Sequence, residues 1–202
     1  MEGARVIVDF YYDFASPWSY IGATQIERVA AENGGTVAWK PILLGAVFKA
    51  IGTPMVPLFT QSQARQRYQF RDFMHWADHW GIEFRFPSRF PMNTVSALRV
   101  ALAAGDDCAR VSLALYRAYW VEDRDIADRG VIESVVSSLG LDGKAMLERI
   151  ESPEVKGKLR ENTEAAVARG VFGVPTFLVG SQLVFGQDRL DFVAAALRGE
   201  PL

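Results

Sequence analysis

The chain has 202 residues, of which half are hydrophobic and 12% aromatic, so it has enough apolar material for a substantial core. Its 22 basic and 24 acidic residues give a net charge of −2 without a basic tract, which argues against nucleic acid or an anionic membrane as a partner. One domain, or one domain with a large insertion, is expected.

The sequence also predicts a cytoplasmic protein. No apolar run approaches the roughly 18 residues of a membrane-spanning helix. The N-terminal residues lack the charged start, long apolar stretch and cleavage site of a signal peptide. The single cysteine, Cys108, cannot form an internal disulfide or a Cys-x-x-Cys redox pair.

The first forty residues have the pattern of a strand, a helix and a second strand. An apolar run predicts a buried strand over residues 5–10. Ser16 is a favoured N-cap, and Pro17 suits the first helical position because its missing N–H is not needed there. Residues 36–40 predict the second strand, which Pro41 ends. Such a unit predicts two parallel strands joined by a right-handed crossover.

The middle of the chain favours helices, and no segment between residues 42 and 169 has a convincing strand pattern. Residues 42–62 contain several glycines and prolines, so we expect them to be irregular and mobile. Beyond them, apolar residues at helical spacing predict a series of helices. These cover residues 63–80, 94–104, 109–121, about 131–139, 144–150 and 152–170.

The last thirty residues return to a strand pattern. Residues 176–179 and 182–185 are short apolar runs separated by Gly180-Ser181, which is a two-residue hairpin signal. A final amphipathic helix is expected over residues 188–197. The fold class is therefore α/β: a thioredoxin-like βαβ–ββα fold with a large all-helical insertion. The expected domains are residues 1–41 with 170–202, and residues 42–169 as the insertion.

Ser16 has two possible roles. As a helix N-cap, its side chain accepts a hydrogen bond from the backbone of its own helix. As a functional group, its hydroxyl donates to an anion held at the helix N-terminus, such as a thiolate, and lowers the pKa of that thiol. A side chain turned inward to cap the helix cannot also donate outward, so the two roles are only partly compatible.

Val174 and Asp188 also have two interpretations each. Proline after Val174 is typical of a strand start or edge. In a thioredoxin-like sheet, however, we expect a cis bond that leaves the N–H and C=O of Val174 free to pair with an extended peptide. Asp188 opens the last helix and complements its dipole there. Alternatively, it receives the ammonium group of a γ-glutamyl ligand.

Other polar residues give weaker signals. His75 and His79 stand four residues apart, but no third histidine or nearby cysteine completes a metal site, so we expect no metal. The same scarcity of histidine argues against a Ser-His-Asp triad. For Lys49, Arg65 and Arg89, each taken alone, an ordinary surface charge is the simplest explanation.

Three motifs together resemble a known family. They are DFYYDFASPWSY at residues 9–20, FGVPT at residues 172–176 and FGQDRL at residues 185–190. Their order and spacing are similar to those of the 2-hydroxychromene-2-carboxylate isomerases, which are related to kappa-class glutathione transferases and more distantly to bacterial disulfide oxidoreductases. The resemblance covers nearly the whole chain and implies a thioredoxin domain interrupted by a helical domain.

The resemblance implies glutathione as the cofactor and suggests site residues by position. Ser16 would be the catalytic residue that holds and activates the glutathione sulfur. Val174 would pair with the cysteinyl part, and Gln187 and Asp188 would bind the γ-glutamyl end. The other glutathione-binding candidates are Thr53, Arg65, Phe185 and Gly186, while Lys49 and, more loosely, Arg89 would contact the substrate carboxylate.

The reaction implied by the resemblance is a glutathione-dependent isomerisation. The thiolate adds to 2-hydroxychromene-2-carboxylate or a related aromatic-degradation intermediate, the ring opens, and elimination yields trans-o-hydroxybenzylidenepyruvate with glutathione regenerated. The expected partners are a small aromatic carboxylate and a second copy of the chain. Residues 53–64 depart from a more polar run in the family, so the resemblance does not fix the substrate.

Two alternatives stay open from the sequence. One is a kappa-like glutathione transferase that conjugates glutathione to an electrophile and consumes it. The other is a catalytically silent thioredoxin-like binding module. A disulfide oxidoreductase is disfavoured, because Ser16 and Ser19 stand at the two cysteine positions of that motif.

Overall fold

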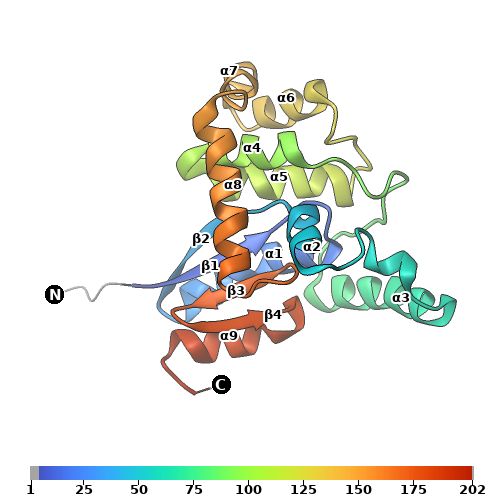
Figure 1. Cartoon of the computed structure of the whole chain (residues 1–202), viewed down its shortest axis with the longest axis vertical. Coiled ribbons are helices and arrows are strands. Elements are labelled where there is room, and N and C mark those ends of the chain that lie inside the picture. The colour runs from blue at the N-terminus through green and yellow to red at the C-terminus, as the bar shows by residue number, and fades with distance from the viewer. Residues whose placement is uncertain (1–4, 202) are drawn as a thin grey trace.

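A mixed four-stranded sheet lies at the centre of the computed structural model, which describes residues 5–201 (Figure 1). The strand order is β2-β1-β3-β4, where β1 is Val6–Tyr12, β2 is Gly35–Pro41, β3 is Thr176–Val179 and β4 is Gln182–Phe185. β1 runs parallel to β2 and antiparallel to β3, and β3 and β4 form an antiparallel hairpin. The predicted parallel strand pair and the hairpin are both confirmed.

Helix α1, Pro17–Glu32, connects β1 to β2 and begins as the sequence predicts. Ser16 has extended backbone angles, and its side chain accepts a hydrogen bond from the Ser19 N–H. Pro17 occupies the first turn, where its fixed φ suits the helix and its missing N–H removes no bond. The start of α1 is therefore fixed by local sequence.

Side chains alternate between the two faces of the sheet, as the strand period requires. Val8, Phe10 and Tyr12 face the main core together with apolar residues of α1 and of α9, Leu190–Leu197. Phe10 is fully buried, and its ring stacks on Phe177 with centroids 5.2 Å apart. Full burial of such a side chain contributes about 1.5–3 kcal/mol to folding.

The opposite face of the sheet is covered by α2, Leu44–Ile51, and by α8, Pro153–Ala168, which crosses in front of the strands (Figure 1). Tyr11 and Leu178 point to this side and pack with Val47 of α2 and Ala166 of α8. Each face of the sheet therefore has its own helical cover.

All the elements that the structure describes between residues 42 and 169 are helical, and the predicted helices are confirmed to within two residues at each end. The α-helices of this segment not yet named are α3, Gln63–Trp80; α4, Val95–Ala103; α5, Cys108–Trp120; α6, Arg129–Ser138; and α7, Gly143–Arg149. Short 3₁₀ turns lie at Pro57–Thr60, Gly105–Asp107 and Gln187–Arg189. Within residues 5–201, none of the helices has the length and apolar character needed to cross a membrane.

The expectation that residues 42–62 are irregular is wrong, because α2 occupies Leu44–Ile51 and a 3₁₀ turn follows. Leu43, at the N-cap of α2, offers no capping side chain. The Leu44 N–H instead donates to a carboxylate oxygen of Asp13, 2.8 Å away and 31 residues earlier in the chain. A remote residue therefore caps α2, and local sequence contains no sign of it.

Candidate functional site

A cavity of about 470 Å³ opens where the N-terminus of α1 meets α2, α3 and the loop before β3. Its volume is in the range of small-molecule sites in proteins. Its walls come from sequence segments far apart, and include Ser16, Trp18, Phe48, Phe73, Val174 and Phe185. The first and second family-like motifs therefore meet at one cavity, as expected, and the third contributes Phe185.

The Ser16 side chain is buried and makes two hydrogen bonds at this cavity. Its oxygen accepts from the Ser19 N–H at 3.2 Å, so the capping role is observed. Its hydroxyl donates to the carbonyl oxygen of Val174, also at 3.2 Å. A ligand that takes this hydroxyl as a donor must therefore replace the Val174 carbonyl as its acceptor.

Val174 fulfils only part of its prediction. The Val174–Pro175 bond is cis, as expected. The Val174 C=O is not free, because it accepts the Ser16 hydrogen bond. The Val174 N–H, by contrast, donates to no residue that the structure describes. Val174 therefore has one unpaired backbone donor, rather than the expected free donor–acceptor pair.

The first turn of α1 supplies a second donor. The Trp18 N–H makes no hydrogen bond within residues 5–201, and Trp18 lines the cavity. The N-terminus of a helix carries a partial positive charge. An unpaired N–H at this position favours the binding of an anion, and a thiolate is one anion that helix N-termini stabilise. Ser16 and Trp18 thus form a polar end in a cavity whose other walls are mostly apolar.

Asp13, which is not among the predicted site residues, is buried directly beneath this loop. Its carboxylate accepts from the Ala15 N–H at 3.0 Å, from the Leu44 N–H at 2.8 Å and from the Thr94 hydroxyl at 2.7 Å. Burial raises the pKa of Asp13, and these three donors oppose the rise. Asp13 therefore ties the Ser16 loop to the starts of α2 and α4. An acidic residue inside an aromatic run was the available sequence signal.

The predicted γ-glutamyl contacts, Gln187 and Asp188, do not line the cavity. Gln187 is buried, and its side-chain oxygen accepts from the Trp80 indole N–H at 3.3 Å. The Asp188 carboxylate is half-exposed and pairs with the neighbouring Arg189 at 3.0 Å. Gly186 precedes them with φ of 106°, a conformation that favours glycine. The structure places these residues beside the site rather than in its wall.

The other predicted residues divide between the cavity and the surface. Thr53 and Phe185 line the cavity. Lys49 is exposed on α2 and does not line it. Arg65 is exposed as well, although it lies one helical turn from Gln69, which does line the cavity.

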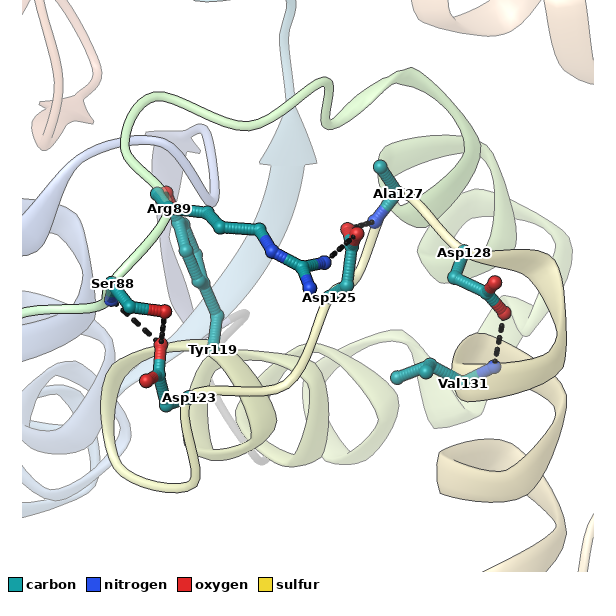
Figure 2. A network of polar contacts seen from close by, with 8 residues as sticks. All are labelled: Ser88, Arg89, Tyr119, Asp123, Asp125, Ala127, Asp128 and Val131. Carbon is teal, nitrogen blue, oxygen red and sulfur yellow. Dashed lines mark hydrogen bonds and ion pairs between the residues drawn. The ribbon is translucent and has the colours of Figure 1, made fainter.

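Arg89 belongs to a polar clamp that joins two loops (Figure 2). Its guanidinium pairs with Asp125, and its backbone oxygen accepts from the Tyr119 hydroxyl at 3.2 Å. Beside it, the N–H and hydroxyl of Ser88 both donate to Asp123, at 2.7 and 3.0 Å. These bonds hold residues 88–89, and the next two residues, 90 and 91, line the cavity. Arg89 itself does not line it.

The two histidines, His75 and His79, lie on α3, and neither is part of a group of side chains that could bind a metal ion. The His79 ring contacts Trp80 and Trp76, with centroids 4.8 and 5.4 Å apart. In the described part of the chain, no three His, Cys, Asp or Glu side chains are placed to share a metal ion.

The profile of one protein family, described as the DSBA-like thioredoxin domain, matches residues 7–198. The chain belongs to this family. The thioredoxin-like α/β fold with a helical insertion is thereby confirmed. The 2-hydroxychromene-2-carboxylate isomerase of Pseudomonas sp. (strain C18) is 33% identical over 206 residues, covering 100% of this chain and 95% of the relative.

Two further comparisons agree with the resemblance seen in the sequence. Glutathione S-transferase kappa 2 of Caenorhabditis elegans is 29% identical over 218 residues, covering 96% of this chain and 95% of its own. A solved structure of a 2-hydroxychromene-2-carboxylate isomerase superposes with a TM-score of 0.82 at 29% identity, over 95% of this chain and 94% of that one. The family resemblance is confirmed, and the names of the relatives support an isomerase.

Proposed function

We propose that this protein is a glutathione-dependent isomerase that acts on 2-hydroxychromene-2-carboxylate or a related aromatic-degradation intermediate. The observation that carries the proposal is the meeting of the Ser16 hydroxyl and the unpaired Trp18 N–H at one end of an apolar cavity. Serine at both motif positions, Ser16 and Ser19, means that the chain has no thiol of its own there. The names of its relatives support the same reaction type.

The residues at the polar end fit the thiol part of glutathione. Ser16 and the Trp18 N–H would hold the sulfur, and the unpaired Val174 N–H would pair with the backbone of the cysteinyl part. Thr53, Phe185 and Arg65 are proposed to contact the rest of the tripeptide. Bound glutathione supplies a thiolate that adds reversibly to a conjugated double bond.

The chain itself would stabilise the ionised sulfur. Rotation about the Cβ–Oγ bond releases the Ser16 proton from the Val174 carbonyl and turns it toward the sulfur, while the oxygen stays in place. A hydrogen bond to a charged group contributes about 1.5–3 kcal/mol, which lowers a thiol pKa by roughly one to two units. The apolar walls, including Phe48 and Phe73, keep this interaction in a medium of low dielectric constant.

The proposal is tested by melting the protein with and without glutathione. A ligand that binds only the folded state stabilises it by about 4 kcal/mol at a thousandfold excess over Kd. We expect millimolar glutathione to raise the Tm, and the oxidised disulfide and a variant tripeptide with serine in place of cysteine to raise it less. An unchanged Tm at millimolar glutathione would contradict the proposed site.

A kappa-like glutathione transferase is the second candidate, and the relatives with that name favour it. The two reactions differ in the fate of the tripeptide. Free glutathione stays constant during isomerisation and falls in proportion to product during conjugation. Measuring free thiol through several turnovers therefore separates the two candidates.

A further inference from the structure

We infer that Trp80 is a positioning residue for ligand binding. Its indole N–H holds the oxygen of the Gln187 side-chain amide, so the amide nitrogen is the group that Gln187 presents to a ligand carboxylate. The inference rests on the proposed function, because the ligand is the γ-glutamyl end of glutathione, which Gln187 and Asp188 are predicted to bind. It adds which atom of Gln187 meets that end and which residue decides this.

The Trp80–Gln187 hydrogen bond has only one possible direction. The indole nitrogen of Trp80 lies 3.3 Å from the side-chain oxygen of Gln187. An indole can only donate, whereas an amide accepts at its oxygen and donates at its nitrogen. The opposite orientation of the amide would set two donors against each other. The nitrogen of Gln187 therefore points away from Trp80.

That nitrogen is left as a free donor. Gln187 is only 2% exposed, yet its amide nitrogen is not among the fully buried atoms without a partner in residues 5–201. No described group accepts from it, so it reaches the surface of the molecule. The backbone N–H groups of Gln187 and Asp188 also have no partner in the described part of the chain. Such donors suit a carboxylate, and the half-exposed Asp188 beside them suits an ammonium group.

Both partners of the bond are held in place by packing. Trp80 is the last residue of α3 and packs against the main core. The Arg28 guanidinium lies over its ring, 5.6 Å from the centroid, and the His79 ring contacts it at 4.8 Å. The Cβ of Gln187 lies against Gly22 of α1, where an added Cβ would be 3.5 Å away. The amide therefore cannot turn its oxygen toward the ligand without losing the indole donor.

The test titrates three tripeptides into the full chain and into Trp80→Phe by calorimetry. They are glutathione, the analogue without the glutamyl carboxylate, 4-aminobutanoyl-cysteinylglycine, and the analogue without the ammonium group, glutaryl-cysteinylglycine. Trp80→Phe should weaken the two ligands with the carboxylate by about three- to tenfold, because the freed amide can turn its oxygen toward it. The ligand without the carboxylate should change by less than about twofold. Equal weakening of all three, or weakening of none, would overturn the inference.

Two further variants separate positioning from packing. Trp76→Phe makes the same chemical change one turn earlier on α3, and all three dissociation constants should stay within about twofold of the wild type. Gln187→Glu keeps an acceptor for the indole but replaces the donor nitrogen by an anionic oxygen. It should weaken both ligands with the carboxylate by about tenfold or more, and should not weaken 4-aminobutanoyl-cysteinylglycine. Comparable loss for all three ligands in Gln187→Glu would overturn the inference.

Gln187→Met tests the bond without a ligand and without altering Trp80. In ¹H–¹⁵N spectra, the indole N–H signal of Trp80 should move upfield and exchange faster with solvent than in the wild type. An unchanged signal would overturn the inference, even if Trp80→Phe failed to fold.

The outcome is separable from the fate of the proposed function. If glutathione does not bind the wild type, both fail. If glutathione binds but the carboxylate makes no difference to the effect of Trp80→Phe, only the inference fails. If the tripeptide with serine in place of cysteine raises the Tm as much as glutathione while the carboxylate pattern holds, the thiol site fails and the inference stands.

Discussion

The hydroxyl of Ser16 donates to the carbonyl oxygen of Val174 across 3.2 Å of space and 158 positions of sequence. The same oxygen caps α1 through the Ser19 N–H. One side chain therefore fixes the start of a helix and joins the two loops that form the polar end of the cavity. In the capping bond the Ser16 oxygen is the acceptor, and in the bond to Val174 its hydroxyl is the donor. The capping bond can therefore persist while the hydroxyl proton changes its acceptor. This makes the structural and functional roles of Ser16 compatible.

Replacing Ser16 by alanine should reduce both stability and activity. The loss of an N-cap costs about 0.5–2 kcal/mol, and we expect urea unfolding to show a decrease in that range. The loss of one charge-assisted hydrogen bond to the sulfur should lower kcat/KM by about 10–100-fold. Near-normal turnover in Ser16→Ala would remove this hydroxyl from the mechanism.

Ser19→Ala is the matched control for that experiment. The Ser19 hydroxyl is fully buried and has no hydrogen-bond partner among the described residues. Its removal leaves no partner unsatisfied, so the free energy of unfolding should stay the same or rise by up to about 1 kcal/mol. Activity should stay within about threefold of the wild type. A loss as large as that of Ser16→Ala would show that Ser19 also acts on the ligand.

Asp13→Asn should change how stability depends on pH. Burial raises the pKa of Asp13 in the folded protein. A raised carboxyl pKa favours folding below the ordinary Asp value of about 3.9, and this contribution is lost as the pH rises through the folded-state pKa. The wild type should therefore lose stability relative to Asp13→Asn as the pH rises through that interval.

Urea titrations of both proteins between acid and neutral pH measure this difference, since the remaining titrating groups are common to both. An offset is also expected. Asparagine keeps one acceptor oxygen for three donors, so the variant should be less stable by about 1–3 kcal/mol in acid. A wild type that gained stability relative to Asp13→Asn with rising pH would contradict the assigned direction of the Asp13 pKa shift.

The fold could be predicted where signals are local. Ser16-Pro17 marks the start of α1, and Gly180-Ser181 marks the hairpin, and both elements are where these pairs predict them. Helix α2 could not be predicted, because its first N–H is capped by Asp13, 31 residues earlier. A cap of this kind exists only after folding, whereas the glycines and prolines around α2 are a local signal for irregular structure.

The site was predictable to a similar extent. Ser16, Val174 and Phe185 meet at the cavity because they belong to motifs at the ends of strands of one sheet, and Thr53, outside these motifs, lines the cavity as well. The surroundings of Arg89 could not be predicted, because its partner Asp125 lies on a loop with no local sequence relation to it. Whether a charged side chain such as Arg89 contacts a ligand or another side chain depends on tertiary contacts, and these cannot be read from the spacing of residues in the sequence.

Removing the Arg89–Asp125 pair should have a small effect on stability. The Arg89 side chain is 67% exposed, and exposed ion pairs contribute about 0.2–1 kcal/mol. We expect Arg89→Gln to lower the free energy of unfolding by less than about 1 kcal/mol. Urea unfolding of Arg89→Gln measures this loss, and Asp125→Asn serves as the matched variant on the other side of the pair.

Two glycines near the site should respond oppositely to alanine. Gly186 has φ of 106°, a backbone conformation that strains any residue with a Cβ, so Gly186→Ala should cost about 1–3 kcal/mol. Gly45 lies in helix α2, and its Cβ would meet only the terminal methyl of Met55, at 2.7 Å. Because that methyl end can move and alanine favours helix, Gly45→Ala should be neutral or stabilising by up to about 1 kcal/mol.

Urea unfolding of both variants measures the contrast. A large loss of stability in Gly45→Ala would mean that Met55 is held rigidly at the cavity, and a harmless Gly186→Ala would mean that the backbone before Gln187 relaxes without strain.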